Sequence, residues 1–292
     1  MSSPPATGPA AASDAASDAA PATVADTGRR VGEHRCRVVA HVAVNSDYRR
    51  LVLAAPAGAL AAAAGQFFHL LCPAGPAGTP FLRRPMSVYR IEPEAGRVQF
   101  LYKVHGEGTR ALATLVPGDV FEILGPLGRG FRLEPHWRHA LLVGRGVGLA
   151  TLAPLAEACS SRGIALTAIL SARRADLVMS EDLFRRAGAR VHAVDDAAGT
   201  SDVAALAATV ERWHADDPFD AVFTCGSARL VRWLQDFAAR HGLAGQVALE
   251  QQMACGLSMC FCCVRPFATE AGVVHRRVCW EGPVFELQET LP

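Results

Sequence analysis

The pattern of predicted secondary structure changes near residue 131, and this change constrains the fold more than any other feature of the sequence. Between Cys36 and Phe131, short β-rich runs are separated by Gly and Pro, and only residues 111–115 resemble a helix. Short strands at this spacing predict an antiparallel barrel or sandwich. The six predicted strands are residues 36–44, 49–55, 65–73, 86–91, 98–104 and 119–127.

Beyond residue 131, strand-like runs alternate with helical stretches, which predicts βαβ units and a parallel sheet. The predicted strands are residues 139–144, 164–170, 190–196, 220–226 and 246–251, and the predicted helices are residues 151–163, 180–188, 201–214 and 227–242. The fold class expected is therefore a β-barrel followed by an α/β domain. A chain of 292 residues is long enough for both.

Charge and hydropathy exclude two classes of partner. Because 29 Lys and Arg oppose 28 Asp and Glu, there is no cationic surplus to neutralise a phosphate backbone, and nucleic acid is not expected. No apolar run reaches the roughly 18 residues of a membrane span. The composition of residues 1–34, mostly Ala, Ser, Pro, Asp, Gly and Thr, predicts a disordered tail without a signal peptide, with a tethering arm as the alternative.

Five of the nine cysteines fall in the last 38 residues, which have little hydrophobic periodicity, so a large apolar core is not expected there. The spacing Cys255-x4-Cys260-x2-Cys263, with Cys279 fifteen residues further on, matches the plant-type [2Fe–2S] pattern. Zinc is the main alternative, although structural zinc sites more often use two C-x2-C pairs, and unligated thiols are the third. Cys262 has no place in the pattern and is interpreted as a buried bystander or a substitute for Cys263. Clustered thiolates suit a reducing compartment, so we expect a cytoplasmic protein.

Two stretches of the barrel region are suited to phosphate. In Arg84-Pro85-Met86-Ser87, the guanidinium fork and the hydroxyl can meet a pyrophosphate. Alone this motif is weak and is often purely structural. The strand residues Leu101-Tyr102-Lys103, followed by a glycine turn that includes Gly108 and Thr109, strengthen it, because backbone N–H groups of such a turn can also bind phosphate.

A glycine-rich turn opens the α/β domain. Gly144, Gly146 and Gly148 follow a predicted strand and precede a helix, a placement that suits a phosphate at the helix N-terminus. Leu149 occupies the place of the third glycine of G-x-G-x-x-G. The next strand ends in residues 171–174, SARR, with no acid at its tip, so the choice between NAD and NADP stays open.

The turn Cys225-Gly226-Ser227 closes the fourth strand of the α/β domain, at the sheet edge where a nicotinamide is expected. Cys225 itself is interpreted as a small core residue and not as a nucleophile. The ten histidines are scattered without metal-ligand spacing, and no Ser/His/Asp or paired-carboxylate constellation stands out. We therefore predict no acid–base catalytic residue and no hydrolytic activity.

With these motifs in this order, the chain resembles the ferredoxin-NADP reductase superfamily over residues 35–286. Within it, the stretch from Leu249-Glu250 to Cys263, and the closing VCWEGPVF at residues 278–285, resemble the iron–sulfur electron-transfer subunit of dihydroorotate dehydrogenase B. The resemblance implies an FAD-binding β-barrel at residues 35–133, an NAD(P)-binding α/β domain at residues 134–249 and a [2Fe–2S] segment at residues 250–292.

The resemblance further implies FAD held by Arg84 to Ser87, Leu101 to Lys103 and Gly108-Thr109, a [2Fe–2S] cluster on Cys255, Cys260, Cys263 and Cys279, and NAD(H) or NADP(H) as substrate. Electrons would pass between these groups and the FMN of a separate dihydroorotate dehydrogenase catalytic subunit in pyrimidine biosynthesis, within a hetero-oligomer.

Arg145 departs from the family pattern, which usually has glycine there, so the nicotinamide site is where this chain is expected to differ. Two other hypotheses remain at this point. One is a diaphorase-like FAD and [2Fe–2S] subunit of a hydrogenase, sulfur reductase or other oxidoreductase. The other is a zinc-stabilised binding module without enzymatic activity.

Overall fold

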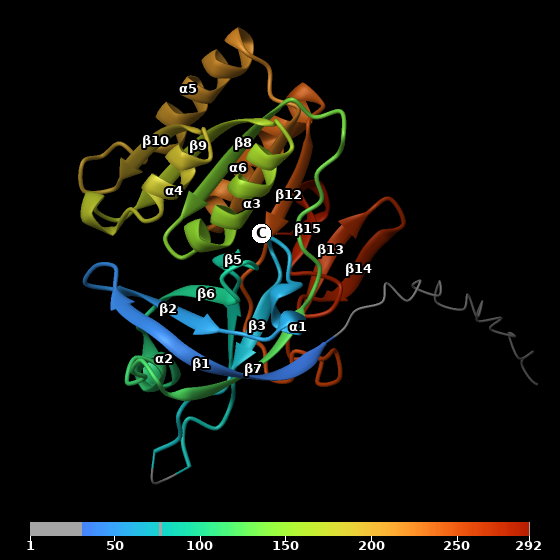
Figure 1. Cartoon of the computed structure of the whole chain (residues 1–292). Coiled ribbons are helices and arrows are strands. Elements are labelled where there is room, and N and C mark those ends of the chain that lie inside the picture. Colours follow the sequence, from blue (N-terminus) through green and yellow to red (C-terminus); the bar gives the residue numbers. More distant parts are fainter. Residues whose placement is uncertain (1–30, 76–77, 292) are drawn as a thin grey trace, which may run out of the picture.

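The computed structural model describes residues 31–75 and 78–291. The predicted disordered tail lies mostly outside the described residues. Residues 32–34, which the sequence placed in that tail, are instead the first residues of a strand. The chain forms two sheet-based domains, and a C-terminal segment packs beside both of them (Figure 1).

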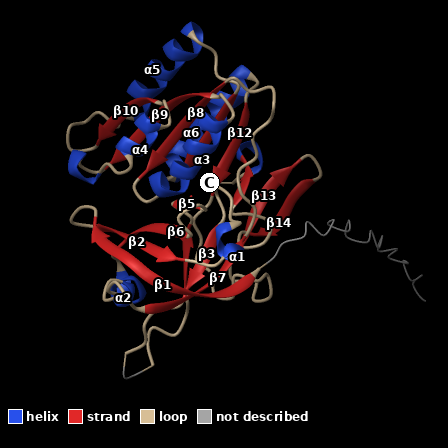
Figure 2. Ribbon diagram, in the orientation of Figure 1, coloured by secondary structure: helices blue, strands red, loops and turns tan. Residues whose placement is uncertain are grey.

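The first domain is a seven-stranded antiparallel half-barrel with the strand order β4-β3-β7-β1-β2-β6-β5 (Figure 2). Its core consists of inward-facing side chains such as Leu51, Phe68 and Phe100, which are fully buried. The strands are β1 (Gly32–Ala43), β2 (Tyr48–Ala54), β3 (Phe67–Leu70), β4 (Arg84–Ser87), β5 (Arg90–Glu92), β6 (Arg97–Lys103) and β7 (Val120–Leu127), with the short helix α1 (Ala57–Leu60) after β2.

Two details of the half-barrel differ from the sequence prediction. The strand expected at residues 86–91 is divided into β4 and β5. Helix α2 (Gly106–Leu112) begins five residues before the predicted 111–115, so the expected glycine turn is its first turn. The reason is local, because the Thr109 hydroxyl accepts a hydrogen bond from the His105 N–H at 2.6 Å and holds the chain in a helical turn.

The second domain confirms the predicted α/β alternation. Its six-stranded sheet has the order β10-β9-β8-β11-β12-β15, and all neighbours are parallel except the last pair. The parallel strands are β8 (His139–Arg145), β9 (Ala165–Ala172), β10 (Arg190–Asp195), β11 (Ala221–Cys225) and β12 (Ala244–Ala248). The helices are α3 (Gly148–Ser161), α4 (Glu181–Arg186), α5 (Val203–Asp216) and α6 (Ala228–His241), with the single turn η1 (Ala175–Leu177) before α4.

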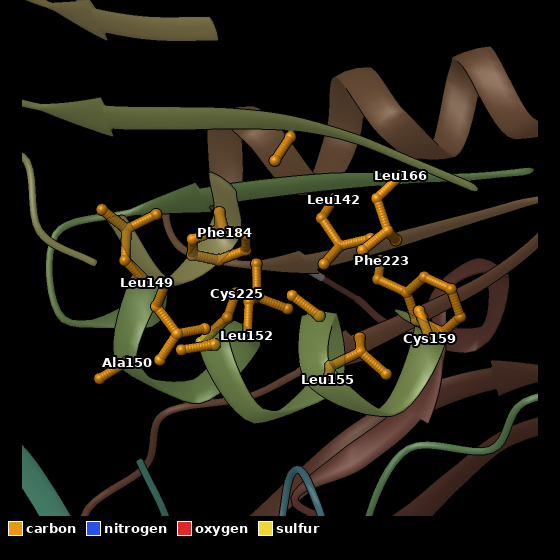
Figure 3. Close-up of a cluster of buried hydrophobic side chains, with 14 of the residues drawn as sticks. Leu142, Leu149, Ala150, Leu152, Leu155, Cys159, Leu166, Phe184, Phe223 and Cys225 are labelled. Carbon is orange, nitrogen blue, oxygen red and sulfur yellow. The ribbon is translucent and has the colours of Figure 1, made fainter. Parts of the chain in front are cut away.

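Both faces of this sheet are covered, as expected for parallel strands. Ala140 and Leu142 of β8 pack in one apolar cluster with α3 and α4, whereas Leu141 and Val143 pack in another with α5 and α6. Figure 3 shows the first cluster, in which Cys225 lies among Leu149 and Leu152. Continuous burial of β8 follows from this two-sided packing.

The C-terminal segment is a hairpin, β13 (Val264–Thr269) and β14 (Gly272–Arg277), followed by β15 (Val284–Glu286) and η2 (Leu287–Glu289). Strand β15 pairs antiparallel with β12 and so attaches the segment to the α/β sheet. A small apolar cluster attaches the C-terminal segment to the half-barrel. This cluster contains Phe67, Leu127, Cys263, Phe267, Val278, Cys279 and Phe285. Within the described ranges, no helix is long and apolar enough to cross a membrane.

Candidate flavin, nicotinamide and iron–sulfur sites

A pocket of about 310 Å³, here called the barrel pocket, lies between the half-barrel and the C-terminal segment. It brings together seven of the residues predicted to bind the cofactor: Pro85, Met86, Ser87, Leu101, Tyr102, Lys103 and Thr109. Sequence reasoning missed the rest of its lining, notably Phe67 of β3 and, after β12, Leu249, Glu250, Gln251 and Met253. An apolar cleft with a few polar groups at its edge is typical of a cofactor site.

Arg84 and Gly108 do not line the barrel pocket but meet beside it. A Cβ added to Gly108 would lie 2.3 Å from Arg84 Nε and 2.5 Å from its Cζ, so the guanidinium occupies the space that this glycine leaves free. The guanidinium donates to the Leu82 carbonyl at 2.6 Å and has no carboxylate partner within the described part of the chain. A cation held without an acidic partner fits the pyrophosphate of a dinucleotide.

A second pocket of about 320 Å³, here called the sheet pocket, lies at the carboxyl ends of β8, β9 and β11. Gly146 and Gly226, two of the residues predicted to bind the nicotinamide cofactor, line it together with Arg145, Arg173 and Ser227. This is the edge of a parallel sheet where nucleotides bind. Lys103, Val147 and Glu250 line both pockets, so the two pockets are adjacent.

Three other predicted residues of the α/β domain, Gly144, Gly148 and Cys225, lie where helix α3 packs against strands β8 and β11. A Cβ on Gly148 would lie 2.1 Å from the carbonyl oxygen of Cys225, so helix α3 approaches β11 as closely as backbone atoms allow. A Cβ on Gly144 would meet Leu149 at 2.7 Å. Cys225 lines neither pocket, and burial raises the pKa of its thiol, which agrees with a core role.

Arg145 lies across the ends of three strands. Its guanidinium donates to the Ser171 hydroxyl at 2.8 Å and forms two hydrogen bonds with the Asp196 carboxylate, at 3.1 and 2.5 Å. The hydrogen bonds from Arg145 hold the pKa of Asp196 down at about 2. The residue that departs from the family pattern is therefore a hydrogen-bonded part of the sheet pocket.

Glu250 is a further candidate site residue, which was not among the residues predicted to bind a cofactor. Glu250 lines both pockets with its side chain exposed at their openings, and the protein atoms packed around its carboxyl group raise its pKa. No sequence signal marks this, because a single acid after a strand is common on protein surfaces. A carboxyl group whose pKa is raised, between a flavin site and a nicotinamide site, can hold a proton there.

Glu250→Gln is expected to have a higher free energy of unfolding than the natural chain, and this difference should grow as pH rises. A folded-state pKa above the ordinary 4.5 means that the folded protein holds this proton more tightly than the unfolded chain. That stabilisation is complete below 4.5 and is lost as pH rises through the raised folded value. Urea unfolding midpoints from pH 4 to 8 check this, with Glu94→Gln in an exposed turn as the control. A constant difference at every pH would contradict it.

The four predicted cluster cysteines form two neighbouring pairs. The Cys255 and Cys260 thiols are neighbours, and so are the Cys263 and Cys279 thiols. The Cys279 backbone N–H donates a hydrogen bond to Cys263 Sγ at 3.4 Å. Across residues 31–75 and 78–291, no three His, Cys, Asp or Glu side chains gather as a single metal ion requires. Two thiol pairs suit two irons, whereas zinc needs all four ligands at one point.

The interpretation of Cys262 as a buried bystander is wrong. Its side chain is exposed, and its thiol contacts the Gln252 carbonyl oxygen at 3.9 Å. The physical reason is that consecutive residues point in different directions, so only Cys263 turns into the small apolar cluster beside Cys279. Cys263 is therefore the better placed of the two adjacent thiols.

Comparisons with known proteins agree with this geometry. One family model, the oxidoreductase FAD-binding domain, matches residues 35–131, and another, the iron–sulfur cluster binding domain of dihydroorotate dehydrogenase B, matches residues 250–291. The NAD(+)-type dihydroorotate dehydrogenase B electron-transfer subunits of Bacillus cereus (strain 03BB102) and Bacillus anthracis (strain CDC 684) are each 33% identical over 231 residues, which cover 78% of this chain and 86% of theirs. The chain belongs to the dihydroorotate dehydrogenase B electron-transfer subunit family.

Solved structures place this family member in the ferredoxin reductase-like fold. An NADH-dependent reduced ferredoxin-NADP oxidoreductase matches with a TM-score of 0.73 and 26% identity, over 87% of this chain and 88% of that one. Full-length CYP116B46 from Tepidiphilus thermophilus matches with a TM-score of 0.60 and 20% identity, over 84% of this chain and 32% of that one, and shows the fold alone. The electron-transfer subunit is thus an oxidoreductase with an FAD-binding domain and an iron–sulfur domain.

Proposed function

We propose that this electron-transfer subunit passes electrons between NAD(H) and the FMN of a dihydroorotate dehydrogenase catalytic subunit, as part of a hetero-oligomer. The observation that carries the proposal is the adjacency of its three sites. Glu250 lines both pockets, and the chain runs from there through Met253, in the barrel pocket, to Cys255. We place the domain boundaries at residues 35–133, 134–249 and 250–292, and the protein in the cytoplasm because its clustered thiols suit a reducing compartment.

The cofactors supply the redox chemistry when bound, because a flavin exchanges a hydride with nicotinamide and single electrons with a [2Fe–2S] cluster. The residues of the chain bind and orient. Arg84 and Ser87 would hold the flavin dinucleotide, Gly146 and Gly226 would leave room for the nicotinamide dinucleotide, and Glu250 would hold a proton between them. Cys255, Cys260, Cys263 and Cys279 would bind the cluster.

Gly108→Ala is expected to weaken FAD retention about tenfold or more. Its new Cβ would displace the Arg84 guanidinium from the space that it occupies, and a charge-assisted pair to phosphate contributes about 1.5 to 3 kcal/mol. Fluorescence of FAD released on dilution measures the change. Arg84→Ala should give a similar loss, and Gly96→Ala, in an open turn of the same domain, should bind FAD normally. Equal retention in all three variants would contradict the role of Arg84.

The function is tested on the protein purified without oxygen. FAD, iron, sulfide and zinc are quantified on one sample, and the protein is then combined with an FMN-containing dihydroorotate dehydrogenase. We expect FAD and a two-iron cluster, with NADH-dependent reduction of orotate only in the combined sample. The same cofactors with no transfer to that partner would favour the diaphorase-like alternative, and zinc without flavin would favour the binding module.

A further inference from the structure

His69 lies between the half-barrel and the iron–sulfur segment. Side chains alternate along β3, so Phe68 and Leu70 enter the barrel core while Phe67 enters the small apolar cluster that contains Cys263 and Cys279. His69 shares the face of Phe67, and their ring centroids are 5.7 Å apart. The imidazole therefore projects from a barrel strand toward the cysteine-containing segment.

The His69 ring lies against the loop that contains the first cluster ligand. A Cβ added to Gly256 would lie 2.9 Å from His69 Nε2 and 3.0 Å from its Cε1. Gly256 directly follows Cys255, and its φ of +68° is one that glycine adopts readily. This close approach places the Nε2 edge of the ring next to the backbone of the cluster loop.

The Nε2 atom is buried and has no hydrogen-bond partner. His69 is 1% exposed, and its Nε2 is one of a few buried side-chain nitrogen or oxygen atoms in the described residues that lack a partner within the protein. Buried polar atoms are nearly always satisfied, so an unsatisfied one points to a ligand. The group that belongs beside this loop is the cluster bound by the four cysteines, and its sulfur atoms are hydrogen-bond acceptors.

We propose that His69 Nε2–H donates a hydrogen bond to a sulfur atom of the iron–sulfur cluster, either an inorganic sulfide or the Cys255 thiolate. The inference rests on the proposed function, because it requires the cluster to be present. The reduced cluster carries one more negative charge than the oxidised cluster, so a donor aimed at its sulfur favours reduction. His69 is thus a positioning residue that adjusts how readily the cluster accepts an electron.

The same strand pair also reaches the flavin site. His69 is the register partner of Pro85 in the β3–β4 ladder, and Pro85 and Met86 of β4 line the barrel pocket. A two-strand ladder therefore carries a flavin-site residue on one strand and the cluster donor on the other. Backbone hydrogen bonds of this ladder therefore fix the spacing between the flavin site and the His69 side chain.

The test measures the cluster and not the overall activity. His69→Leu removes the donor, and His69→Gln keeps an amide N–H at a similar distance from the backbone. In redox titrations followed by electron paramagnetic resonance, His69→Leu should reduce the equilibrium constant for cluster reduction about tenfold, which is about 59 mV lower for one electron. His69→Gln should recover most of this shift. His275→Leu, on an exposed position of the hairpin in the same segment, should show none.

A second readout needs no variant. Pulsed electron paramagnetic resonance on the reduced natural protein, grown with ¹⁵N-labelled histidine, should detect a histidine nitrogen coupled to the cluster. This decides the matter if His69→Leu fails to fold or to assemble a cluster. A full cluster with no coupled histidine nitrogen overturns the inference and leaves the proposed function intact, whereas a natural protein without iron overturns both.

Discussion

Cys263→Ser is expected to give a protein that keeps its FAD and loses its cluster, from about two irons per chain to none. Cys263 is 2% exposed and directly contacts Cys279, so it has no replacement from solvent or from a mobile side chain. A serine oxygen is a poor ligand where iron and sulfide call for thiolate. Iron and sulfide analysis and the visible spectrum of the purified variant measure the loss.

The adjacent cysteine provides the matched control. Cys262→Ser changes the same atom one residue away, but that thiol is exposed and contacts only a carbonyl oxygen. We expect a normal cluster content in Cys262→Ser. A cluster that survives in Cys263→Ser and disappears in Cys262→Ser would reverse the assignment of the two thiols.

Gly148→Ala is expected to slow the reduction of the flavin by NADH about a hundredfold. The added Cβ would lie 2.1 Å from the Cys225 carbonyl oxygen, which cannot move without shifting the end of β11. Helix α3 and the turn at Gly226 would then separate, and a displacement of about 1 Å in a site that orients two reactants costs on the order of a hundredfold in rate. Stopped-flow absorbance of the flavin measures the rate.

Two comparisons separate this effect from general damage. Reduction of Gly148→Ala by dithionite, which needs no nicotinamide site, should proceed as in the natural protein. Gly163→Ala, just beyond the other end of α3, adds a Cβ at a positive φ that meets no atom within 4 Å, and its flavin should be reduced by NADH at the natural rate. Equal rates with NADH in Gly148→Ala and the natural chain would show that the sheet pocket does not bind the nicotinamide.

Much of the organisation could be predicted because it depends on short-range patterns. The period of apolar residues distinguished the half-barrel from the α/β domain, and the parallel strands and helices of the latter were expected within a few residues of their observed bounds. The cysteine spacing indicated the cluster, because ligands supplied by one tight loop must be close in sequence. The turn from Gly144 to Gly148 was found in the same way.

Other features could not be predicted because they arise where distant segments meet. The antiparallel pairing of β15 with β12 follows from the return of the chain to the sheet edge, which no local pattern records. The exposed Cys262 and the buried Cys263 have the same chemistry, and only packing against Cys279 separates them.

By itself, the sequence determined the order of the domains and predicted the four cluster cysteines and the glycine turn, because periodicity and ligand spacing are properties of neighbouring residues. Only the tertiary structure decided that Glu250 is shared by two pockets and that His69 Nε2 is buried against Gly256. The lining of a pocket and the hydrogen-bond partners of a buried atom are set by which segments pack together, and these segments are distant in sequence.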